Sequence, residues 1–116
     1  MNKSMKKLKE VKRTMGAVGK MHPEAMQGFQ NFMKGSKSDG ALNAKTKELI
    51  GVAISIARQC SWCITLHIKN ALDAGATREE IIEASLVAVT LGGGPALMHM
   101  HYVFEALDDL ENDQKK

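Results

Sequence analysis

Two cysteines separated by two residues stand in the middle of this 116-residue chain, in the segment Cys60-Ser61-Trp62-Cys63. They are the only cysteines of the chain, and His67 follows the second by four residues. A single close pair is typical of a thiol redox site or a metal site rather than of a secreted disulfide framework. In its thiolate form such a cysteine attacks peroxides and disulfides, and His67 could take up the thiol proton.

The spacing of these residues suits the first turns of a helix. Each helical residue turns by ~100° and rises by ~1.5 Å, so Cys60 and Cys63 are about 60° apart in projection. Their Cα atoms would then be close to the ~5.5 Å separation that a disulfide prefers. His67 lies one turn beyond Cys63 on the same face. A helix N-terminus carries partial positive charge, which lowers the pKa of a thiol placed there.

A carboxylate precedes the pair by twelve residues, because Glu48 lies within an otherwise apolar run. In one straight helix, Glu48 and His67 would be about 30 Å apart. If the chain reverses around residues 58–60, two antiparallel helices bring the two side chains to a similar level. Glu48 could then pass protons to and from His67. The equally open alternative is a helix glutamate that pairs with a lysine.

Zinc binding is the rival chemistry for this segment. Cys60, Cys63 and His67 are plausible ligands, and either His99 or His101 could supply a fourth. Structural zinc sites usually bring a second closely spaced pair, whereas His99 and His101 are two residues apart and face different directions on a helix. The sequence therefore favours redox chemistry, and we expect His99 and His101 at an interface or at partly exposed helix positions.

The elements that must position these residues are predicted to be helices. Hydrophobic residues make up 44% of the chain and aromatic residues only 4%, and methionine occurs eight times. A core of aliphatic side chains and methionine suits packed helices better than sheets. The pattern predicts an all-α fold of about six helices, with a central antiparallel helix pair. The length suits a single domain over residues 1–116.

Local signals place several helix boundaries. Pro23 fits a first helical position, and Asn43 is a good N-cap. Gly75 suits the residue after a helix end. Thr77 and Glu80 together form a capping box for the helix that follows.

Two further segments bear on how these helices pack. Residues 49–57 are nearly all apolar, which is typical of a central, buried helix. The run Gly92-Gly93-Gly94-Pro95 predicts a tight turn between two helices that approach closely. It is not a phosphate-binding loop, because no Lys-Ser or Lys-Thr follows it.

Charge is unevenly distributed along the chain. Residues 1–20 carry seven Lys or Arg and one Glu, whereas the C-terminal segment is acidic at Glu105, Asp108, Asp109, Glu111 and Asp113. The net charge of +3 is too mild to argue for nucleic-acid binding. We therefore expect the two ends of the chain to lie near each other, within one subunit or between subunits, and favour this over a nucleic-acid-binding arm.

The sequence predicts a cytoplasmic protein. Lysines interrupt the N-terminal region, so no apolar core of a signal peptide follows the first residues. Glycine or polar residues break the apolar runs well short of the ~18 residues that a membrane span needs. We expect no membrane partner.

The pattern Glu48…Cys60-x-x-Cys63-x-x-x-His67 resembles the AhpD-like alkylhydroperoxidase branch of the carboxymuconolactone decarboxylase family. The resemblance extends from about residue 23 to residue 107, and segments 42–50 and 74–81 look like the family's entry to the central helix and its next turn. It implies an all-α fold that assembles as trimers or hexamers, and it implies the reduction of hydroperoxides.

The resemblance also implies a role for each residue of the pattern. Cys63 corresponds to the cysteine that is oxidised to sulfenic acid, and Cys60 to the one that resolves it as an intramolecular disulfide. His67 and Glu48 correspond to the proton relay that activates Cys63. Trp62 departs from the best-studied members of this branch, which have a second histidine there, and the chain is a single motif-bearing half of theirs.

These inferences define the expected reaction. It converts a hydroperoxide and a dithiol to an alcohol, water and a disulfide, and it requires no metal or organic cofactor. The partners would be a hydroperoxide, an unknown dithiol or protein reductant, and other copies of the chain. The alternatives are a carboxymuconolactone decarboxylase-type enzyme, disfavoured because the decarboxylase branch lacks the cysteine pair, and a Cys/His zinc-binding helical assembly protein.

Overall fold

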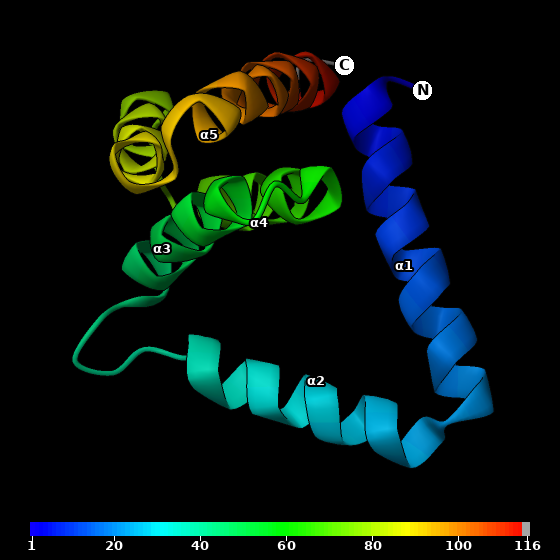
Figure 1. Cartoon of the computed structure of the whole chain (residues 1–116). Helices are drawn as coiled ribbons and strands as arrows, with labels where there is room; N and C mark the ends of the chain where they lie inside the picture. The colour runs from blue at the N-terminus through cyan, green and yellow to red at the C-terminus, as the bar shows by residue number, and fades with distance from the viewer. Residues whose placement is uncertain (115–116) are drawn as a thin grey trace.

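The computed structural model describes residues 1–114, and it describes side chains as far as Glu111. Over these residues the chain is all-α, as predicted, and contains no strand (Figure 1). Its five helices are α1 (Lys3–Met21), α2 (Pro23–Lys37), α3 (Ala44–Ala57), α4 (Ser61–Asp73) and α5 (Arg78–Gln114). The predicted single domain over residues 1–116 stays a prediction.

The helix boundaries follow the local signals in the sequence. Pro23 opens α2, and the side chain of Asn43 accepts a hydrogen bond from the Thr46 N–H at the start of α3. Thr77 and Glu80 form the predicted capping box, in which each side chain accepts the other residue's backbone N–H. The predicted caps are therefore confirmed.

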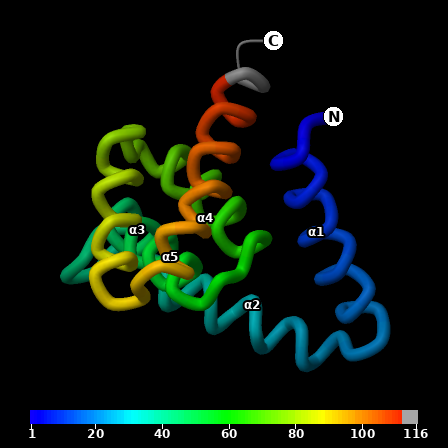
Figure 2. The backbone as a smooth tube through the Cα atoms, turned by 45° about the horizontal axis from the view of Figure 1, so that its top comes forward, coloured from blue at the N-terminus to red at the C-terminus, as the bar shows by residue number. Residues whose placement is uncertain are grey.

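The predicted number of helices differs from the observed one at Gly93. About six helices were expected, whereas five are counted over the described residues, because α5 joins the segments before and after Gly93 across a kink. Gly93 has φ 69° and ψ −151°, which kinks this helix. Figure 2 shows that α5 turns back on itself there. The turn itself was predicted, but the separation into two helices was not confirmed.

The hydrophobic core lies among α3, α4 and α5, which we call the bundle. Its fully buried side chains include Val52, Ile56, Ile64, Ile68, Ile81, Val103 and Leu107. The expectation that α3 is buried almost all round is wrong for the single chain. Ile50 and Ile54 on α3 are 44% and 54% exposed, so this helix has one buried and one open apolar face.

Helices α1 and α2 form an arm that extends away from the bundle (Figure 1). Helix α2 has no buried residue, although it is amphipathic. Phe29 and Phe32 on α2 are 52% and 73% exposed. The arm is therefore joined to the rest of the chain mainly through the first turns of α1 and the end of α2.

The two ends of the chain lie together within one subunit, as one of the two predicted arrangements required. Ser4 is buried, and its backbone N–H donates to Asp109 Oδ2 at 3.1 Å. Lys7 Nζ lies 3.3 Å from Glu105 Oε1. The basic start of α1 therefore packs on the acidic end of α5, although the side chain of Asp113 lies outside the described residues.

One helix, Arg78–Glu111, is long and apolar enough to cross a membrane by length and composition alone. This is weak evidence for a membrane span, since core helices meet the same criteria. Here the segment is broken by the turn at Gly93.

Candidate active site

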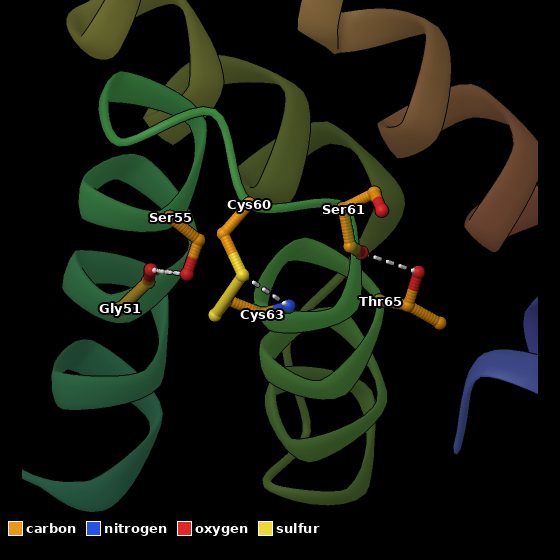
Figure 3. Close-up of a disulfide and its surroundings, with 6 residues drawn as sticks. All are labelled: Gly51, Ser55, Cys60, Ser61, Cys63 and Thr65. Carbon is orange, nitrogen blue, oxygen red and sulfur yellow. Dashed lines mark hydrogen bonds between the residues drawn. A yellow bond between two sulfur atoms is a disulfide. The ribbon is translucent and has the colours of Figure 1, made fainter. Parts of the chain in front are cut away.

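The two cysteines lie where the chain reverses between α3 and α4. Gln59 has a φ of 57°, and the next residue, Cys60, donates its backbone N–H to the Ser55 carbonyl at 3.1 Å. This left-handed residue ends α3 and lets α4 begin at once in the opposite direction. The predicted reversal around residues 58–60 is thus observed, and Figure 3 shows the cysteines between α3 and α4.

Cys60 and Cys63 are joined by a disulfide, with their Cα atoms 5.2 Å apart. Cys60 is the N-cap of α4, and its sulfur accepts the backbone N–H of Cys63 at 3.2 Å (Figure 3). In the reduced chain the same N–H and the positive end of the helix would stabilise a thiolate at Cys60. Both cysteines are partly exposed, so reagents can reach them.

Glu48 and His67 meet across the antiparallel pair of α3 and α4. His67 Nδ1 lies 2.9 Å from Glu48 Oε2, a hydrogen-bond distance. An ionised carboxylate can only accept, and with Glu48 in that form Nδ1 carries the proton and Nε2 is the basic nitrogen. Glu48 is 7% exposed, so this contact forms in a largely water-free place. The spatial proximity expected from the reversal is therefore observed.

Glu48 also has the lysine partner that the alternative interpretation required. Lys37 Nζ lies 3.3 Å from Glu48 Oε1, so the two carboxylate oxygens have different partners. Glu48 therefore contacts both kinds of partner that the sequence left open, a histidine and a lysine. Sequence reasoning missed Lys37 itself, because it precedes Glu48 by a loop and belongs to another helix.

Gly51 is the second residue that sequence reasoning missed. A Cβ atom at this position would lie 2.7 Å from His67 Nδ1 and 3.1 Å from two other ring atoms. The ring of His67 therefore lies directly against the α3 backbone. The available signal was a glycine inside a strongly helical segment, which costs stability unless space requires it.

Trp62 lies on the side of α4 that faces the arm. Its Nε1–H donates to Glu10 Oε1 on α1 at 3.2 Å, and its side chain is about half exposed. Together with Val11, Met15 and Val18 it lines a groove of about 730 Å³. This groove is bounded by α1, whereas the cysteine side chains lie toward α3.

The two remaining histidines of the zinc hypothesis make local contacts on α5. His99 Nδ1 lies 2.8 Å from the Pro95 carbonyl oxygen, and His101 Nε2 lies 3.5 Å from Glu105 Oε2. His99 is partly exposed and His101 is exposed. Within the described part of the chain, no three His, Cys, Asp or Glu side chains are placed to share a metal ion. The zinc hypothesis thus gains no support from this arrangement.

Comparison with known proteins identifies the family of this chain. The model of the carboxymuconolactone decarboxylase family matches residues 23–106. An uncharacterized protein from Cupriavidus necator is 38% identical over 104 residues, which cover 90% of this chain and 92% of that protein. The chain belongs to the carboxymuconolactone decarboxylase family, as its resemblance predicted.

Solved structures extend the similarity to almost the whole chain. A carboxymuconolactone decarboxylase family protein from Legionella pneumophila is 39% identical, with a TM-score of 0.85 and 97% of each chain covered. A family member from Thermotoga maritima, for which a part in the antioxidative response has been suggested, is 29% identical. Its TM-score is 0.83, with 94% of this chain and 93% of that chain covered. These similarities are consistent with the AhpD-like branch.

Proposed function

We propose that this protein is a thiol-dependent peroxidase that reduces hydroperoxides through Cys60 and Cys63, with Glu48 and His67 as the proton relay. The observation that carries the proposal is the arrangement around α4. A cysteine pair within disulfide distance starts this helix, and a carboxylate-bound histidine stands one turn later. A pair that alternates between dithiol and disulfide supplies the two electrons that a hydroperoxide requires.

The first step would be attack on the hydroperoxide. His67 Nε2 takes the proton of the Cys63 thiol, and the thiolate attacks the terminal peroxide oxygen. The O–O bond breaks, Cys63 becomes a sulfenic acid, and the leaving alkoxide receives the proton as an alcohol. Glu48 holds the Nδ1–H of His67 and stabilises the imidazolium that forms between these transfers.

The second step would close the disulfide. The Cys60 thiol gives up its proton and its sulfur attacks the Cys63 sulfenic acid; a sulfur–sulfur bond forms, and the hydroxyl group leaves with that proton as water. An external dithiol then reduces the disulfide by exchange and becomes a disulfide itself, which restores both thiols. The reducing cytoplasm would supply such a dithiol, either a small molecule or a protein. No metal or organic cofactor takes part.

We further propose that the protein acts as a homo-oligomer, a trimer or a hexamer. Large apolar side chains are exposed on all five helices of the single chain. They include Phe29, Phe32, Ile50, Ile54, Leu86, Val87, Leu91, Leu97 and Met98. Exposed apolar area of this extent is typical of a protein–protein contact surface. Other copies of the chain would cover it by symmetry.

The family relationship and a relative's name also bear on the proposal. The suggested antioxidative role of the Thermotoga maritima relative favours peroxide chemistry. The family description favours a second function, decarboxylation of a lactone. The two functions differ in their need for sulfur, because only the peroxidase reaction uses Cys60 and Cys63.

The decisive experiment incubates reduced protein with an organic hydroperoxide and a dithiol such as dithiothreitol. We expect peroxide consumption above the uncatalysed rate in the wild type, and a fall to background in Cys63→Ser. In a parallel reaction without the dithiol, the reduced Cys60→Ser variant should complete one turnover and then stop at the sulfenic acid, which dimedone traps. Equal consumption by Cys63→Ser would overturn the proposal. Lactone decarboxylation that survives the loss of both cysteines would establish the second function.

A further inference from the structure

We propose that Lys37 is a positioning residue for the relay. It holds Glu48 so that this carboxylate orients the His67 ring and stabilises its protonated form. The inference rests on the proposed peroxidase function and adds a residue from outside the family pattern. It follows from the contacts of Glu48, the placement of Lys37 at the end of the arm, and the proton transfers that the relay must perform.

The two oxygens of Glu48 have separate partners on opposite sides. Lys37 Nζ is 3.3 Å from Oε1, and His67 Nδ1 is 2.9 Å from Oε2. Because a carboxylate is planar, holding one oxygen fixes the direction of the other. Glu48 is 7% exposed, so water cannot replace either partner fully. Removing the ammonium would leave the charge of a nearly buried carboxylate without its cation.

Lys37 reaches this carboxylate because the loop that follows it is pinned. It is the last residue of α2, and the next carbonyl, that of Ser38, accepts a hydrogen bond from Lys47 Nζ at 2.6 Å. Asp39 Oδ1 accepts the Ala44 N–H at 2.6 Å. One side chain and one backbone N–H of α3 thus fix the end of a helix that otherwise buries nothing, so Lys37 has a defined place beside Glu48.

The contact bears on the proton that His67 must move. Among the described residues, the charged or titratable groups in contact with Glu48 are Lys37 from α2 and His67 from α4. In its ionised form, Glu48 accepts the Nδ1–H of His67, and this leaves Nε2 of the same ring free to take the Cys63 proton. A carboxylate that has lost the cation on its other oxygen is free to turn away from Nδ1, and it no longer fixes this tautomer.

A second ion pair of the chain provides a matched control. Lys45 Nζ lies 3.0 Å from Glu80 Oε2, and the Lys45 side chain is 35% exposed, against 36% for Lys37. Lys45 likewise joins two helices, but its carboxylate partner does not contact a histidine. A merely structural role for Lys37 would therefore have the same consequences as the role of Lys45.

The test compares Lys37→Met, Lys37→Arg and Lys45→Met with the wild type. The first readout is peroxide consumption against pH, and the second is the set of ¹⁵N chemical shifts of the reduced protein's His67 ring. For Lys37→Met we expect the rate of peroxide consumption to fall about tenfold, because a carboxylate without its cation no longer holds the His67 ring in place. The His67 nitrogens should shift from one tautomer toward a mixture. Lys37→Arg should restore both readouts, and Lys45→Met should change neither.

The other outcomes distinguish a failure of the role of Lys37 from a failure of the peroxidase function. An unchanged profile and unchanged nitrogen shifts in Lys37→Met, or equal changes in Lys45→Met, would overturn the role of Lys37. If the wild type consumes no peroxide, the peroxidase function fails, and the nitrogen shifts still decide whether Lys37 controls the Glu48–His67 pair. Should Lys37→Met fail to fold, Lys37→Gln removes the charge with a polar side chain, and the same criteria apply.

Discussion

The bundle and the arm are built from similar amphipathic patterns and differ in what covers their apolar faces. In the bundle, α3, α4 and α5 bury one another's aliphatic side chains, and Ile56, Ile68 and Leu107 are fully inaccessible. In the arm, α2 carries two phenylalanines on its apolar face and buries no residue. Helical periodicity thus states which face is apolar, but it does not state which partner covers that face.

The candidate site follows the same division. Cys60, Cys63, Glu48 and His67 all lie in the bundle, at the antiparallel contact of α3 and α4. The arm supplies only Lys37 to the carboxylate of the relay. Stability and the proposed chemistry therefore depend mainly on the bundle, while the arm contributes a charge.

The largest expected contrast is in stability. Leu107→Ala removes a fully buried side chain and should lower the free energy of unfolding by about 2–5 kcal/mol. Phe32→Ala removes more carbon, but from a side chain that is 73% exposed, and should cost less than about 1 kcal/mol at low protein concentration. Urea unfolding of both variants measures the difference. A large loss for Phe32→Ala that depends on protein concentration would mean that another copy covers the arm.

The next contrast concerns the charge of the relay. Glu48→Gln keeps the size of the side chain and an acceptor oxygen for His67 but removes the negative charge. We expect kcat/KM for an organic hydroperoxide to fall by about a hundredfold at neutral pH, the usual size of a general acid–base contribution. Glu83→Gln, at an exposed position of α5, is the control and should retain full activity. A wild-type rate for Glu48→Gln would remove Glu48 from the relay.

Two glycines test the same contrast between bundle and arm. Alanine at Gly51 would clash with the His67 ring, whereas alanine at Gly28 on α2 meets nothing within 4 Å. Gly28→Ala should raise the free energy of unfolding by about 0.5–1 kcal/mol through helix propensity and leave activity unchanged. Gly51→Ala should lower the peroxidase rate by about tenfold or more, since small displacements of a catalytic group are costly. Equal rates for the two variants would show that His67 tolerates displacement.

Much of the bundle could be predicted from the sequence because its signals are local. Asn43 and the Thr77–Glu80 box mark helix starts through hydrogen bonds within one turn. The cysteine pair and His67 share a helix, so their spacing alone predicts their common face. Glu48 required one further assumption, the chain reversal, which the positive φ of Gln59 provides.

The parts that were missed or miscounted depend on contacts between elements. Lys37 reaches Glu48 because hydrogen bonds from the first turn of α3 hold the intervening loop, and no spacing rule describes this. Gly51 is required by a ring that comes from another helix. The number of helices depends on Gly93, because two helical segments that turn back on each other across this residue are joined in α5. Each of these outcomes is fixed by tertiary structure.

The smallest expected effect is on thermal stability, and it concerns how the helix caps of the bundle and of the arm depend on pH. The Thr77 backbone N–H, with a contribution from Lys45, lowers the pKa of Glu80 at the start of α5. A carboxyl group whose pKa is lower in the folded state stabilises the protein at pH values above its pKa in the unfolded chain, which is about 4.3. This stabilisation is lost as the pH falls through the lower pKa of the folded state. The N-cap of α1 is the uncharged Asn2, which has no such dependence.

Glu80→Gln should therefore lower the melting temperature at pH 7 by a small amount and leave it nearly equal to that of the wild type at pH 3. The control is Asn2→Ala, whose loss should be similar at both values because an amide does not titrate. Thermal unfolding followed by circular dichroism measures both. If the deficit of Glu80→Gln were as large at pH 3 as at pH 7, the cap would act through hydrogen-bond geometry and not through the charge of Glu80. The bundle and the arm would then be capped by the same means.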